Sequence, residues 1–157
     1  MKQVKRRLKE MPEEDRERFH DQLLAALDVA PEYMQRWAQE DEKFRVMGKQ
    51  EVLQLRAAGW TVGSHSLTHR SIGMLRPDDM LEEIAGSKSK LELILSNKVL
   101  TFAYPYGEPI HIGAAAAVCK KAGYRYAFTT VPGSIATGDD PFMIKRIDYK
   151  EFCRDYL

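Results

Sequence analysis

The amino-terminal part of the chain carries the amphipathic pattern of a helix. Pro12 is followed by acidic residues at 13–15, and apolar residues then recur at every fourth position. Proline in the first turn, acids at the positive end of the helix dipole and one apolar stripe predict a helix that ends near Asp28. The stripe consists of Phe19, Leu23 and Leu27.

A second, shorter helix is predicted from Pro31, and the polar residues 39–43 form a connector after it. Neither helix carries a pattern of residues that indicates chemistry. We therefore interpret residues 1–43 as an N-terminal helical cap or insertion. The apolar residues of the second helix are Tyr33, Met34 and Trp37.

Helical and extended patterns alternate along the rest of the chain, residues 44–157. This alternation is typical of βα units with a mainly parallel sheet. Because a closed (β/α) barrel needs upwards of about 200 residues, the α/β pattern predicts either part of a barrel or a small open sheet. The predicted helices are 49–59, 76–97 and 110–123, and the predicted strands are 60–64, 99–105, 124–130 and 142–149.

Composition narrows the class of protein only slightly. The chain has 157 residues, the length of one domain, and a net charge of +1, which gives no indication of a polyanionic partner such as nucleic acid. The sequence contains no apolar run of about 18 residues, so no transmembrane helix is predicted. The charged amino terminus lacks the apolar region of a signal peptide. Cys119 and Cys153 are expected to be free thiols, and a cytoplasmic location is expected.

His65 and His69 directly follow the predicted strand 60–64. Loops after parallel strands are where α/β folds place chemistry, and four-residue spacing puts two imidazoles on one side of a helical turn. Neutral imidazole is the commonest metal ligand. The zincin motif is excluded, because Ser66 stands where that motif has glutamate. The alternative to a metal site is a pair of solvated or capping histidines.

The segment "TFAYPYGEP", residues 101–109, ends the next predicted strand. Aromatic residues, proline and glycine this close together predict a rigid turn. Backbone N–H groups after Pro105 could stabilise an oxyanion, and the alternative is a strand end packed by aromatic rings. His111, at a predicted helix start, is interpreted as an exposed or capping histidine.

The segments "GWTVGSHSLTH", "FAYPYG", "AGYRYAFTT" and "FMIKRID", in this order, resemble the polysaccharide deacetylase family, the NodB-homology group of carbohydrate esterase 4. The resemblance covers roughly residues 44–148. It implies a distorted (β/α) barrel and a divalent metal, usually zinc. It also implies hydrolysis of an N-acetyl or related acyl group on a carbohydrate.

Carried over residue by residue, the resemblance makes His65 and His69 metal ligands. It makes the backbone N–H of Tyr106 an oxyanion donor. Tyr104, Pro105 and Tyr106 are expected to line the substrate cleft together with the histidines.

The family's first motif, an aspartate pair that supplies the general base and the third metal ligand, has no counterpart before His65. Asp15, Asp28 and Asp41 lie in helical or polar contexts rather than after an apolar strand. We therefore expect a truncated C-terminal portion of a deacetylase with little activity of its own. Self-association or a complementing N-terminal segment is the expected partner. The alternatives are a non-catalytic remnant that binds carbohydrate or a partner, and a small metal-binding α/β protein unrelated to sugars.

Overall fold

The computed structural model describes residues 8, 11–30 and 45–148. The chain divides into two compact units, residues 1–51 and 52–157. In the first unit, α2 (Glu13–Ala26) confirms the predicted amino-terminal helix. The helix predicted from Pro31 and the domain boundary predicted after residue 43 lie outside the described residues, so that domain division stays a prediction.

Helix α4 (Lys49–Ala57) confirms the predicted helix 49–59. It ends where Gly59 adopts φ +88°, the left-handed conformation that glycine provides at a helix end. The backbone N–H of Trp60 bonds to the carbonyl of Leu55, and this bond closes the helix end and keeps residue 60 against it.

A parallel sheet of order β1-β2-β3 forms the centre of the second unit. The pairing of β1 with β2 and of β2 with β3 is parallel throughout, which confirms the pattern of βα units. The strands are β1 (Thr101–Ala103), β2 (Tyr126–Pro132) and β3 (Ile144–Arg146).

The predicted buried strand 60–64 is reduced to one parallel bridge between Ser64 and Phe102. Ser64 donates its N–H to Thr101 O at 2.9 Å, and its carbonyl accepts the N–H of Ala103 at 2.8 Å. Trp60 is 66% exposed. The prediction of a buried strand is therefore wrong for most of this segment, because the end of α4 still holds Trp60 and only Ser64 reaches β1.

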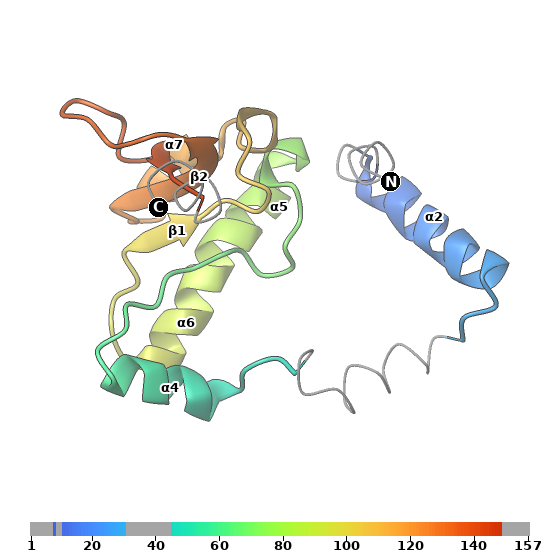
Figure 1. The fold of residues 1–157 in the computed structure, drawn as a ribbon, viewed down its shortest axis with the longest axis horizontal. Coiled ribbons are helices and arrows are strands. Elements are labelled where there is room, and N and C mark those ends of the chain that lie inside the picture. The colour runs from blue at the N-terminus through green and yellow to red at the C-terminus, as the bar shows by residue number, and fades with distance from the viewer. Residues whose placement is uncertain (1–7, 9–10, 31–44, 149–157) are drawn as a thin grey trace, which may run out of the picture. The chain divides into compact units, whose positions relative to one another are not determined.

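The predicted helix 76–97 is one continuous rod, visible in Figure 1 as the long helix beside the strands. It consists of α5 (Pro77–Leu81), a π-helical turn η3 (Glu82–Gly86) and α6 (Ser87–Leu95). The predicted helix 110–123 is divided into a 3₁₀ turn η4 (Pro109–His111) and α7 (Ala115–Lys121). A further 3₁₀ turn, η2 (Ile72–Met74), precedes the rod.

One hydrophobic core joins the rod, α7 and the sheet. Its most deeply buried members come from all three kinds of element, which fixes the strand ends relative to the helices. The buried core residues are Ile72, Met80, Ile84, Val99, Phe102, Tyr104, Ile112, Ala115, Cys119, Tyr124, Ala127 and Phe142. Among the described residues, no helix is both long and apolar enough to cross a membrane.

Cys119 is expected to resist alkylation while the protein is folded. It is a free thiol with no exposed surface, and burial raises its pKa to about 12. The thiolate is the reactive form, so only about one molecule in 10⁴ would carry it at pH 8. Iodoacetamide labelling at pH 8, followed by mass spectrometry of the Cys119 peptide, should give rapid modification in denaturant and very slow modification without it. Rapid labelling of the native protein would contradict the buried position of this thiol.

Candidate functional site

His65 lies immediately after the bridge at Ser64, at the carboxyl end of the sheet. Its Nδ1 lies 2.8 Å from the carbonyl oxygen of Ala103, the last residue of β1. A carbonyl oxygen can only accept a hydrogen bond, so Nδ1 must carry the proton. The lone pair is then on Nε2, on the other side of the ring, where it is available to a metal.

His69 is brought to His65 by a non-helical turn. Ser66 and His69 have φ values of +70° and +61°, in the left-handed region, and the N–H of His69 donates to Ser66 Oγ at 2.9 Å. The two imidazole rings lie edge to face with centroids 4.9 Å apart. The prediction that the two rings lie on the same side of the chain agrees with this contact. The prediction of a helical turn is wrong, because side chains, and not backbone carbonyls of the turn, accept its N–H groups.

Glu83, in the π-helical turn η3, binds the N–H groups of the two residues between Ser66 and His69. Its Oε2 accepts the N–H groups of Leu67 at 2.9 Å and Thr68 at 3.0 Å, and its Oε1 accepts the Thr68 hydroxyl. Only 4% of Glu83 is exposed. The sequence reasoning missed this residue. The sequence does place its carboxylate on the same helix face as Met80 and Ser87. A charge buried on that face needs hydrogen-bond donors.

The "YPYG" turn lies beside the histidines and is attached to the end of β2. Tyr106 has φ +63°, which is rare for an aromatic residue, and its ring centroid lies 5.1 Å from that of His69. Thr130 binds the last two carbonyls of the turn: its Oγ1 donates to Tyr106 O at 2.7 Å and its N–H to Gly107 O at 2.9 Å. Thr130 is a second residue that the sequence reasoning missed.

Tyr104 and Pro105 belong to the core. Both are almost completely buried, and the Tyr104 hydroxyl donates to the carbonyl of Phe142 at 2.9 Å. Of the three residues expected to line a substrate cleft, Tyr106 is half-buried and its ring lies next to that of His69. The substrate contacts of Tyr104 and Pro105 stay a prediction that this burial does not support.

His111 is buried, with 2% of its surface exposed, so its interpretation as an exposed or capping histidine is wrong. Its Nδ1 lies 2.7 Å from Ser71 Oγ, and its ring centroid lies 5.3 Å from that of Tyr106. Burial follows from the close packing of η2 on η4, where a Cβ on Gly73 would approach the carbonyl carbon of His111 to 2.7 Å. Four rings therefore follow one another: His65, His69, Tyr106 and His111.

The histidine pair suits a divalent metal in its chemistry but offers two ligands. Both side chains are exposed, and His65 presents a defined nitrogen. Catalytic zinc usually has three protein ligands. Within residues 8, 11–30 and 45–148, no group of three His, Cys, Asp or Glu side chains could hold a metal ion. Asp140 lies in the loop that returns to the start of β2, where Pro141 O accepts the N–H of Ala127, whereas the histidines lie at the carboxyl end of the sheet.

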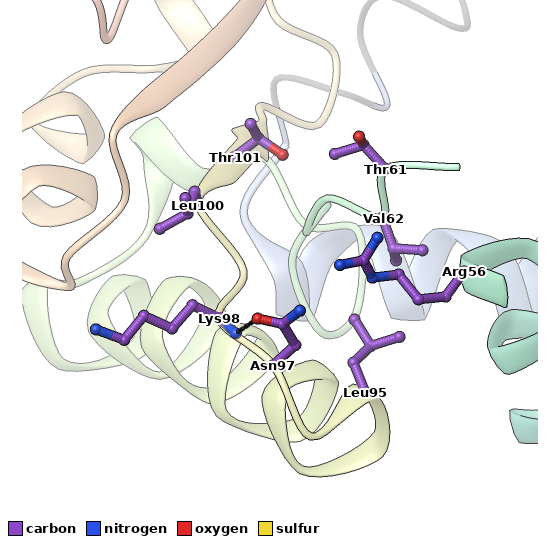
Figure 2. Close-up of a pocket in the computed structure, with 8 residues that line it drawn as sticks. All are labelled: Arg56, Thr61, Val62, Leu95, Asn97, Lys98, Leu100 and Thr101. Carbon is purple, nitrogen blue, oxygen red and sulfur yellow. Dashed lines mark hydrogen bonds between the residues drawn. The ribbon is translucent and has the colours of Figure 1, made fainter. Parts of the chain in front are cut away.

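A separate hollow lies where β1 begins, and Figure 2 shows the residues that line it. It is bordered by Thr101, the first residue of β1, while the histidines follow the strand ends. Ligands of parallel α/β folds bind at the carboxyl ends of the strands, so this hollow is not part of the candidate site. Its lining residues are Arg56, Thr61, Val62, Leu95, Asn97, Lys98, Leu100 and Thr101.

Comparison with known families identifies the segment that contains the site. The sequence profile of the polysaccharide deacetylase family matches residues 20–127, which include the histidine turn, the "YPYG" turn and the rod. The match begins within the region expected to be a helical cap. A search of curated protein sequences found no match.

Solved structures of deacetylases share the fold. The polysaccharide deacetylase BC0361 from Bacillus cereus is 27% identical, with a TM-score of 0.59 over 69% of this chain and 36% of that one. The deacetylase PplD from Streptococcus pyogenes, in complex with acetate, is 19% identical, with a TM-score of 0.58 over 64% of this chain and 44% of that one. IcaB from Ammonifex degensii is 22% identical, with a TM-score of 0.58 over 71% of this chain and 52% of that one.

This chain thus spans between about a third and a half of the length of these structures. The similarity confirms the predicted fold class, an α/β fold that corresponds to part of a polysaccharide deacetylase (β/α) barrel.

Proposed function

Because the chain belongs to the polysaccharide deacetylase family, we propose that it carries part of a metal-dependent hydrolase site that removes N-acetyl or related acyl groups from a carbohydrate. One observation carries this proposal. His65 and His69, after the bridge at Ser64, and Tyr106, after β1, lie side by side within the segment that matches the family.

His65, through Nε2, and His69 would hold the divalent metal, for which zinc is the first choice because it accepts imidazole readily. When bound, the metal supplies a Lewis acid that polarises an acyl carbonyl. Tyr106 would direct its backbone N–H toward the acyl oxygen. The support for this role is the position of the turn, which Thr130 fixes next to the ring of His69.

The third ligand and the general base would come from outside the described residues. We infer an acidic segment, either in a longer chain or in a partner, because two neutral imidazoles do not offset the charge of a dication. The second candidate function is a non-catalytic carbohydrate-binding or partner-dependent module. The observation that favours it is that, in the described part of the chain, no third His, Cys, Asp or Glu side chain joins these two histidines to form a metal site. Cytoplasmic location and self-association stay predictions.

Acetate release from an N-acetylglucosamine oligomer tests this proposal. The chain with added zinc should release acetate slowly, roughly 10²–10⁴-fold below a site with a general base. His65→Ala and His69→Ala should each abolish the release, while His20→Ala, on α2, should leave it unchanged. Acetate release that persists in the presence of a metal chelator would contradict the metal-dependent mechanism. Zinc binding and oligosaccharide binding without any release would favour the non-catalytic module.

A further inference from the structure

The turn between the two histidines is closed by a side chain from a distant part of the sequence. Leu67 and Thr68 direct their N–H groups to the carboxylate of Glu83, which is 16 and 15 residues further along the chain. The residues on either side, Ser66 and His69, are both in the left-handed region. Backbone in such conformations persists only where the surrounding structure holds it.

The carboxylate is placed by the π-helical turn η3. Wide turns of this kind interrupt α-helices frequently at functional sites, because they alter which side chains face a neighbouring segment. Here the carbonyl of Ile84 accepts the hydroxyls of Ser87 and Tyr124, each at 3.0 Å. These bonds satisfy the carbonyl and fix the turn against α6 and the segment between α7 and β2.

Ser87, the first residue of α6, binds the start of the histidine segment. Ser64 Oγ donates to Ser87 Oγ at 2.6 Å, and both side chains are buried. The rod therefore contacts the segment on both sides of His65, at Ser64 through Ser87 and at Leu67 and Thr68 through Glu83.

We propose that Glu83 is a positioning residue, which sets the turn so that His65 and His69 present their rings to one metal ion. Its carboxylate binds the two residues Leu67 and Thr68, so it acts on the histidines through the backbone between them. The inferred effect of Glu83 on metal binding rests on the proposed function, whereas its effect on the conformation of the turn does not.

Four variants separate geometry from charge. Glu83→Ala removes all three bonds to the turn. Glu83→Gln keeps them in principle, because its amide oxygen accepts both N–H groups and its NH₂ group donates to the Thr68 hydroxyl. Glu83→Asp keeps the charge, but its shorter side chain moves the carboxylate away from the N–H groups of the turn. Glu82→Ala is the matched control, since Glu82 is the exposed neighbour in the same π-helical turn.

The first measurement is zinc affinity of the 157-residue chain by calorimetric titration. Glu83→Ala and Glu83→Asp should weaken binding by about 10–100-fold, as is typical when the support of a metal ligand is lost. Glu83→Gln should retain most of the affinity, and Glu82→Ala all of it. Unchanged affinity in folded Glu83→Ala or Glu83→Asp would overturn the proposal.

The second measurement is amide hydrogen exchange without metal. The amides of Leu67 and Thr68 should exchange faster in Glu83→Ala or, if that variant does not fold, in Glu83→Asp, and at the wild-type rate in Glu82→Ala. Slow exchange in all variants would overturn the proposal even if the chain binds zinc. Failure of the wild-type chain to bind zinc would instead contradict the proposed function, and exchange alone would then decide whether Glu83 holds the turn.

Discussion

Replacement of Gly107 by alanine is expected to destabilise the folded chain by roughly 2–5 kcal/mol. Gly107 has φ +67°, and a Cβ there would lie 2.6 Å from the backbone nitrogen of Thr130 and 2.7 Å from its Cγ2. The nitrogen belongs to β2 and cannot move away without breaking its bond to Gly107 O. The substitution therefore combines left-handed strain with a clash that separates the "YPYG" turn from the sheet.

Gly123→Ala is the matched control for this prediction. Gly123 has φ +81°, but a Cβ there would have nothing within 4 Å, so only the conformational penalty of about 1–2 kcal/mol applies. Urea unfolding followed by circular dichroism would give both free energies of unfolding. Equal losses in the two variants would show that the turn does not pack against Thr130 as described.

The second large effect is expected on metal affinity. His65→Ala and His69→Ala should each weaken zinc binding by more than about 100-fold, because the loss of an outer-shell partner alone costs 10–100-fold. In the proposed site, where these two histidines are the ligands, each variant leaves one imidazole. Calorimetric titration gives the affinities.

His20→Ala is the control for this measurement, since His20 is an exposed histidine on α2. An equal loss of affinity in His20→Ala would mean that the measured binding is general histidine binding and not the proposed site.

The elements that the sequence predicted well are those with strong periodic signals. The rod from Pro77 to Leu95 has a proline and two acids at its start, and these act locally. The parallel pairing of the strands followed from alternation with helices. The proximity of Tyr106 to His69 was predicted by the rule that parallel strand ends share one edge.

Features that depend on tertiary contacts were missed. No sequence pattern indicates the π-helical turn, which is stabilised by Tyr124, 40 residues away from the carbonyl it binds. The conformation of the histidine turn depends on Glu83, so the helical spacing rule failed there. His111 was misjudged because its burial results from the close approach of Gly73, a contact between two separate loops.

The most direct test of the histidine pair as a metal site is ¹⁵N NMR of the histidine side chains during a zinc titration. The chain has four histidines, so each ring can be assigned by substitution. We predict that Nε2 of His65 and one ring nitrogen of His69 shift on zinc binding, while Nδ1 of His65 stays protonated and the rings of His20 and His111 do not change. Unchanged resonances of His65 and His69 at saturating zinc in the folded protein would contradict the assignment of these two residues as metal ligands.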